Sequence, residues 1–340
     1  MESRTDARAM ARKMKFDPAY LAAFEQKLFI EGQGKTRRLT NFFVLLLLAT
    51  VIATLGLVAG STATIIGAMI VAPLMEPIMA TAAAAVMGSA RRVLYALALT
   101  IAGIIAVILL SMLLALIVPE VNLSFTENAE LASRINPGLV ALLTALASGA
   151  AGAYITAREE ISDAMGGVAI AISLVPPLCV VGIGLRLGDW GAAAGALELF
   201  ATNLLAILLA GGVVFLLAGL GRHANRGEQT RVRIAAFSVI LVATILIAVP
   251  LSVTTFQAIE GALQDRAAGA AVVEWLAGTA YQTVQVNVSG ESVVALVEGS
   301  GELKPLGALA DSLAATLKHP VVVNLRVIQS QLQPSGAPAP

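Results

Sequence analysis

Long runs of hydrophobic residues, separated by short polar segments, dominate the chain up to residue 253. A bilayer is crossed by a helix of roughly 17–25 mostly apolar residues. Each run meets this length, so the pattern predicts an α-helical integral membrane protein with about seven transmembrane helices. The predicted spans are Phe42–Val58, Ile65–Met87, Val93–Val118, Pro137–Ile155, Met165–Leu187, Leu197–Leu220 and Ile234–Val253.

The pattern changes after residue 253. Residues Thr283–Val288 read T-V-Q-V-N-V, and this alternation of polar and apolar positions predicts a half-buried strand. We predict a small soluble α+β domain over residues 254–332, followed by a disordered tail rich in Pro and Ala at 333–340. The predicted elements are a helix at Gln257–Leu276, strands at Thr283–Val288 and Val293–Val297, a helix at Pro305–Leu317 and a strand at Val321–Ile328.

The composition agrees with a membrane protein. Hydrophobic residues make up 58% of the chain and charged residues 13%, whereas soluble proteins carry about 25% charged residues. The formal net charge of +0 gives no reason to expect a nucleic-acid partner. One cysteine, Cys179, and two distant histidines, His223 and His319, provide neither a disulfide nor a Cys- or His-based metal site. We therefore expect no cofactor, no metal and no enzymatic activity.

Lys and Arg residues are distributed unevenly between the two sides of the predicted spans. The segments 1–41, 89–92, 157–164 and 221–233 hold 16 of the 22. Because cytoplasmic loops carry the excess of Lys and Arg, the N-terminus is predicted to be cytoplasmic. An odd number of spans then places the C-terminal domain outside the cytoplasm.

Residues 1–41 form the predicted cytoplasmic N-terminal segment. Phe16, Tyr20, Phe24 and Leu28 recur every four residues, as on one face of an amphipathic helix. Such a stripe can lie on the inner membrane surface, or it can pack against the protein's own cytoplasmic loops. The sequence leaves both alternatives open.

Prolines interrupt the second and the fifth predicted spans, at Pro73 and Pro77 and at Pro176 and Pro177. Aligning Pro73 with Pro176 gives an offset of 103 residues, and aligning it with Pro177 gives 104. Each interrupted span is the middle member of a group of three, and an odd number of spans per group gives the two groups opposite orientations. We therefore predict a 3+3 inverted repeat plus one further span, as in many secondary transporters. The predicted segments are a first three-span unit at 42–118, an outer loop at 119–136, a second unit at 137–220, and an inner loop with the seventh span at 221–253.

A proline inside a helix removes one hydrogen bond and clashes with the carbonyl four residues earlier. Lipid cannot satisfy such a carbonyl, so it must face protein, water or a bound solute. Matched breaks in two spans predict a central cavity, although neighbouring Ser and Thr side chains can also mend a proline-kinked helix. The carbonyls that these prolines are predicted to free are those of Met69, Pro73, Ile172 and Ser173.

Two polar residues are predicted to lie deep in the membrane. Glu76 is near the middle of the second span, and an ionisable group at that depth normally faces the protein interior or water. It can bind a cation or carry a proton, or it can be a protonated side chain bonded to a neighbouring carbonyl. Asn203, in the sixth span, can contact a solute or link two helices.

Three sequence segments resemble a known family. They are the run Ile66–Leu74, with G-A-M-I-V-A-P-L at its end, the stretch Val175–Leu178, and Leu199–Leu204. Over roughly Ser61–Leu205 the chain is similar to the family catalogued as domain of unknown function 389. The resemblance implies a prokaryotic multi-span protein of the cytoplasmic membrane and brings no established activity.

Taken together, these patterns predict a membrane transporter or channel for a small solute or ion, with the pathway between the two proline-broken helices. The alternative is a membrane-anchored sensor or scaffold whose extracytoplasmic domain binds a partner. The expected partners are the lipid bilayer and an unidentified small solute or ion, and small residues such as Gly56 and Gly60 also permit a homo-oligomer. The predicted solute-binding residues are Met69, Pro73, Glu76, Pro77, Ile172, Ser173, Pro176, Pro177 and Asn203.

Overall fold

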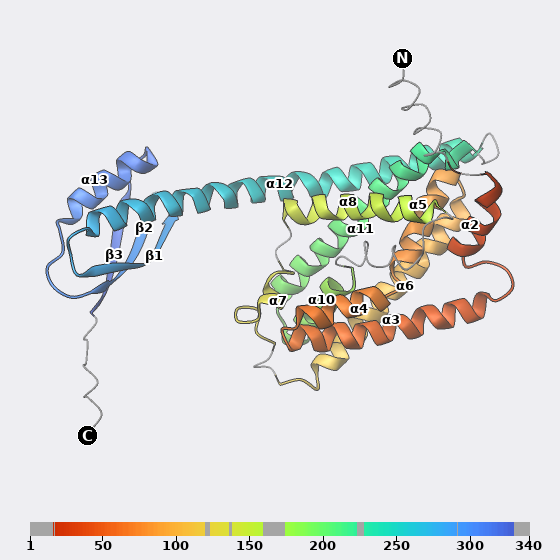
Figure 1. Cartoon of the computed structure of the whole chain (residues 1–340), viewed down its shortest axis with the longest axis horizontal. Coiled ribbons are helices and arrows are strands. Elements are labelled where there is room, and N and C mark those ends of the chain that lie inside the picture. The colour runs from red at the N-terminus through yellow and green to blue at the C-terminus, as the bar shows by residue number, and fades with distance from the viewer. Residues whose placement is uncertain are drawn as a thin grey trace, which may run out of the picture. The chain divides into compact units, whose positions relative to one another are not determined.

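The computed structural model of the protein describes residue 16 and residues 18–119, 123–135, 138–158, 174–222, 228–290 and 292–329. The chain divides into two compact units, Met1–Ser252 and Val253–Pro340. The first unit is helical, and the second contains a small sheet (Figure 1).

The first unit contains short and long helices in alternation. The described elements are η1 (Pro18–Tyr20), α2 (Leu21–Leu28), α3 (Lys35–Val58), α4 (Thr62–Val71), α5 (Met75–Met87), α6 (Ala90–Ala115), α7 (Ala129–Ala132), α8 (Leu139–Thr156), α10 (Val175–Leu187), α11 (Trp190–Ala218) and η3 (Leu220–Arg222). Helix α12 (Glu228–Leu276) begins in the first unit and ends in the second.

Four of the described helices, α3, α6, α8 and α11, are long and apolar enough to cross a membrane. Helices α4 and α5, which are bent by 50° at the break between them, together also meet this length as one broken span. The fifth predicted span is described only from Leu174 onward, and the seventh, Ile234–Val253, lies within α12. The described residues therefore form a mostly helical protein with four long apolar helices.

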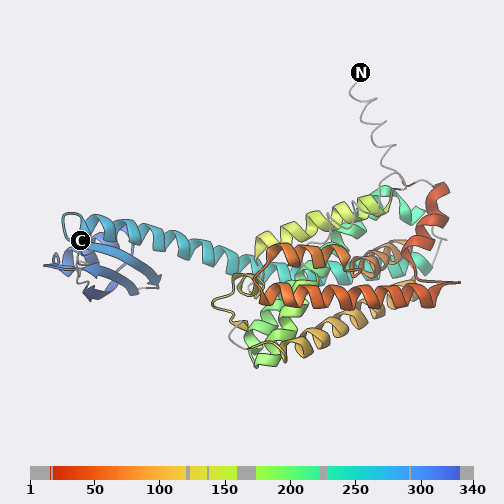
Figure 2. The ribbon, with the colours of Figure 1, turned by 60° about the horizontal axis from the view of Figure 1, so that its bottom comes forward.

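The outer surfaces of the long helices carry large apolar side chains. Leu109, Leu113 and Leu116 are 60%, 58% and 55% exposed, and Leu48 on α3 is 53% exposed. Helices α3 and α6 lie side by side and pack against each other (Figure 2). Exposed apolar surface of this kind is typical of a protein that contacts lipid.

Helices α5 and α10 correspond in length and in position. Each has 13 residues, follows a leucine and ends at a glycine in the left-handed conformation, Gly88 (φ 73°) or Gly188 (φ 72°). Each is followed at once by a long helix, α6 or α11. The two helices begin 100 residues apart, at Met75 and Val175, whereas the aligned prolines are 103 or 104 residues apart. Helix α5 packs against α11, and α10 packs against α6.

Glycines at the contacts between these helices let the two backbones approach closely and pack tightly. A side chain at Gly182 of α10 would lie 2.6 Å from the Ile108 carbonyl oxygen of α6. A side chain at Gly149 of α8 would lie 2.6 Å from the Ile207 Cα of α11. Both contacts are too short for any residue other than glycine without movement of a helix.

The apolar stripe of the N-terminal segment is buried against the protein. Phe24 is fully buried, and its ring lies 5.9 Å from the ring of Phe215 in α11 in an edge-to-face arrangement. Phe16, Tyr20 and Leu28 are 4%, 8% and 6% exposed. Of the two alternatives for this stripe, the structure shows packing on the protein, and the surface that it contacts is helical.

The second unit is a three-stranded sheet with helices on one face. The strands are β1 (Tyr281–Ser289), β2 (Ser292–Gly299) and β3 (Val322–Gln329), and α13 (Leu306–Leu317) connects the last two. Strand β2 lies in the centre, antiparallel to β1 and parallel to β3. Its alternate residues Val293, Ala295 and Val297 are fully buried beneath α13 and the end of α12. These elements occur in the predicted order, with the difference that the predicted helix Gln257–Leu276 is the end of the longer α12.

Candidate functional site

The predicted break in the second span is present. Helix α4 ends at Val71, Ala72 is extended (φ −68°, ψ 124°), and α5 begins at Met75. The residue before a proline is driven toward extended backbone, so Pro73 accounts for the conformation of Ala72. The bend of 50° between α4 and α5 follows from this interruption.

The other three prolines lie in the first turn of a helix. Pro77 is the third residue of α5, and Pro176 and Pro177 are the second and third residues of α10. The first-turn N–H groups of a helix have no intrahelical partner, so a proline there loses no hydrogen bond. The Pro73 carbonyl accepts the Glu76 N–H at 3.1 Å, so the prediction that Pro77 frees it was wrong. Ile172 and Ser173 lie outside the described residues.

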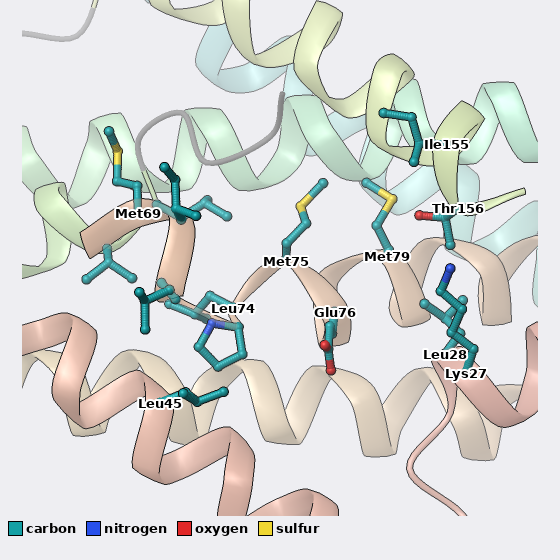
Figure 3. Close-up of a pocket in the computed structure, with 16 residues that line it drawn as sticks. Lys27, Leu28, Leu45, Met69, Leu74, Met75, Glu76, Met79, Ile155 and Thr156 are labelled. Atoms are coloured by element: carbon teal, nitrogen blue, oxygen red, sulfur yellow. The ribbon is translucent and has the colours of Figure 1, made fainter. Parts of the chain in front are cut away.

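A cavity of about 320 Å³ lies at the break between α4 and α5, and we call it the main cavity (Figure 3). It is bounded by the end of α4, the start of α5, the end of α8 and the start of α10. Its lining is mostly apolar, with one carboxylate and one ammonium group. The described lining residues are Lys27, Leu28, Leu45, Met69, Ile70, Val71, Ala72, Pro73, Leu74, Met75, Glu76, Met79, Ile155, Thr156, Leu174 and Val175.

Glu76 is the second residue of α5, and its side chain is exposed to the main cavity. A carboxylate in the first turn of a helix is stabilised by the helix dipole. Glu76 also lines a second cavity of about 10 Å³ with Leu28, Phe29, Ile30 and Pro77. A space of that size holds about one water molecule. Glu76 thus lies directly after the break, near the middle of the segment that α4 and α5 form together.

Lys27 is a functional candidate that sequence reasoning missed. The predicted spans contain no Lys, Arg or His near their middle, and Lys27 belongs to the N-terminal segment. Lys27 belongs to α2 and lines the same cavity as Glu76, together with the Thr156 hydroxyl of α8 (Figure 3). In the sequence, Lys27 could have been noticed only because it stands next to Leu28 of the apolar stripe. The packing of α2 on the other helices is what brings Lys27 to the cavity.

Only some of the predicted site residues lie together at the two cavities. Met69, Pro73 and Glu76 line the main cavity, and Pro77 lines the second one. Pro176 and Pro177 are buried in α10, and their neighbours Leu174 and Val175 line the main cavity in their place.

Asn203 is 2% exposed in α11 and is not among the described residues that line the main cavity. Met75 and Met79 were missed, although both side chains rise from one face of α5 into the cavity (Figure 3). No group of three His, Cys, Asp or Glu side chains suited to a metal ion occurs among the described residues.

Fold and cavity together define a helical protein with apolar helices of membrane-crossing length and an interior site at a helix break. Residues 69–209 match the model of the family described as "Domain of unknown function (DUF389)", which confirms the resemblance found in the sequence. The chain is also 31% identical to an uncharacterized protein of Methanocaldococcus jannaschii over 206 residues, covering 61% of this chain and 63% of that relative. No solved structure matches the chain.

Proposed function

We propose that this protein is a membrane transporter or channel for a small solute or ion, and that the main cavity is part of its pathway. The supporting observation is that the broken segment α4–α5 and the start of α10 meet at one cavity that contains a carboxylate. Ligand sites are typically concave, mostly apolar and furnished with a few polar groups, at volumes of about 300–1,000 Å³. A cavity of about 320 Å³ lies at the small end of this range, as a small solute requires.

The matched helices support an inverted repeat. In this proposal α3, α4–α5 and α6 form one three-span unit, and α8, the segment ending in α10, and α11 form the other. Reciprocal packing of α5 on α11 and of α10 on α6 is the pattern that two related units produce about a shared axis. With the run Ile234–Val253 of α12 as a seventh span, the N-terminus is cytoplasmic and the C-terminal domain lies outside the cytoplasmic membrane.

Flux in reconstituted liposomes tests the role of Glu76. The protein is reconstituted with pH-sensitive and potassium-sensitive dyes, and proton and cation flux are recorded over a range of pH. We expect Glu76→Gln to change the flux or its pH dependence, because the amide keeps the shape of the acid but cannot ionise. Glu198→Gln is the matched control, since Glu198 lies on α11 away from the described cavity lining. Equal flux of Glu76→Gln and wild type at every pH would remove Glu76 from the pathway.

A sensor or scaffold function is favoured by one observation on the second unit. Among the described strands β3 pairs only with β2, so no described strand occupies its other edge. Val322, Val327 and Ile328 on this strand are 62%, 41% and 45% exposed. An open edge with apolar side chains is suited to strand addition by a peptide. Co-purification of one stoichiometric protein, lost in Val327→Pro, would support this function over transport.

A further inference from the structure

The N-terminal segment closes one side of both cavities. We call residues 18–31 the N-terminal latch, which comprises η1, α2 and the turn that follows. Lys27 and Leu28 of the latch line the main cavity, and Leu28, Phe29 and Ile30 line the second cavity beside Glu76. In Figure 3, Lys27 and Leu28 lie beyond Met79 along α5, at the end of the cavity opposite Leu74. The latch therefore forms part of the wall of both cavities.

One attachment of the latch is apolar and deeply buried. Phe24 is fully buried against Phe215 of α11, and Phe16 packs on Phe24 with ring centroids 5.2 Å apart. The Phe16 N–H donates to the Ala218 carbonyl at the end of α11 at 2.8 Å. Salt does not weaken apolar contacts of this kind, so this end of the latch serves as a fixed anchor.

The other attachment is polar and partly exposed. Arg92, in the first turn of α6, contacts Glu25 at 3.0 Å and Glu31 at 3.1 Å, and its guanidinium lies 4.4 Å from the ring centre of Phe29. The side chains of Arg92, Glu25 and Glu31 are 22%, 30% and 49% exposed. Ion pairs that water reaches are weak and are screened by salt.

Arg38 of α3 also holds the C-terminal end of the latch. Its guanidinium donates to the carbonyls of Gln26, Lys27 and Phe29 at 2.7, 2.5 and 2.8 Å. The carbonyls of Gln26 and Lys27 belong to the last turn of α2 and that of Phe29 to its C-cap residue, where backbone acceptors have no intrahelical donor. The C-terminal end of the latch is thus held by two arginines, from α3 and α6, and the N-terminal end by α11.

We propose that the latch is a gate, in which the Arg92 ion pairs hold residues 25–31 over the cavity and their release opens it to water. This inference rests on the proposed transport function. The latch joins α11 of one three-span unit to α3 and α6 of the other, so relative movement of the units must break one attachment. Because salt screens the Arg92 ion pairs and leaves the apolar contacts of Phe24 intact, the Arg92 end opens first, with Phe24 as the hinge.

Accessibility of a cavity residue to a charged thiol reagent tests the gate without any assumption about the solute. Met75→Cys is introduced into a Cys179→Ala background, and the full-length protein in lipid nanodiscs is modified with a methanethiosulfonate reagent. We expect Arg92→Gln to raise the modification rate about fivefold, as loss of two partly exposed ion pairs allows. Arg91→Gln is the matched control, because Arg91 is exposed and has no ion pair among the described residues.

The double variant Glu25→Gln/Glu31→Gln removes the same ion pairs by changing the two carboxylates instead of Arg92. It tests the gate if Arg92→Gln misfolds. Raising the salt concentration from about 0.05 M to about 0.5 M is expected to speed modification of the wild type more than that of Arg92→Gln. Equal rates in all variants at both salt concentrations, with the proteins intact by size-exclusion chromatography, would overturn the gate. Faster modification without flux of any solute in liposomes would leave the gate standing and refute transport.

Discussion

Replacing Gly182 by alanine tests the packing of α10 against α6, the contact that joins the two proposed units. An added Cβ would lie 2.6 Å from the Ile108 carbonyl oxygen and 2.8 Å from the Met112 nitrogen. Both are backbone atoms that cannot rotate away. The Ser111 hydroxyl, which donates to the Ile108 carbonyl at 3.0 Å, is also displaced. The helices must therefore separate by roughly 1 Å to restore ordinary contact distances.

The expected cost follows from this overlap. Overpacking destabilises by about 1–3 kcal/mol, and the better helix propensity of alanine returns up to about 1 kcal/mol. Because the overlap is with backbone atoms, we expect a cost near the upper end of this range, and the net loss of about 2 kcal/mol lowers the apparent Tm by roughly 4–8 °C. The assay is the fraction of monodisperse protein after heating in detergent. Gly67→Ala is the control, because a Cβ at Gly67 meets nothing within 4 Å. If both variants were equally stable, close α10–α6 packing would be refuted.

Three further predictions concern other parts of the molecule. Glu130 accepts a hydrogen bond from the Thr62 hydroxyl, which lowers the pKa of its carboxyl below 4.5. The stability that wild type has over Glu130→Gln should be complete above about pH 4.5 and disappear as pH falls through the lowered pKa, as thermal melts would show. Phe24→Ala should lower stability by about 3–5 kcal/mol, and Phe24→Leu by much less, because Phe24 fills a fully buried site against Phe215. The fragment 254–332 should fold alone with mixed helix and strand circular dichroism, since its core is its own; a random-coil spectrum would contradict this.

Several features could be read from the sequence because their causes are local. Apolar runs predicted the positions of α3, α6, α8 and α11, since a helix in lipid needs only enough consecutive apolar residues. Pro73 predicted the break before α5, because a proline restricts the residue that precedes it. The alternation in Thr283–Val288 predicted β1 for the same kind of reason, as opposite faces of a strand meet opposite environments.

Other features depended on where each helix begins. A proline breaks a helix in its interior but fits the first turn of one, so the prediction for Pro77 was wrong, and Pro176 and Pro177 likewise lie in the first turn of α10. The position of a helix start is decided by the packing of neighbouring helices, and this information is not contained in a short stretch of sequence.

The sequence by itself determined that the chain is mostly helical, that its long helices are apolar, and that one of its spans is interrupted. These properties follow from hydrophobicity and backbone geometry within a few residues. Only the tertiary structure decided that Lys27 and Leu28 of the N-terminal segment line one cavity with Glu76. Contacts of this kind depend on side-chain packing between segments about fifty residues apart in the chain. The periodicity of apolar residues within one segment does not encode that packing.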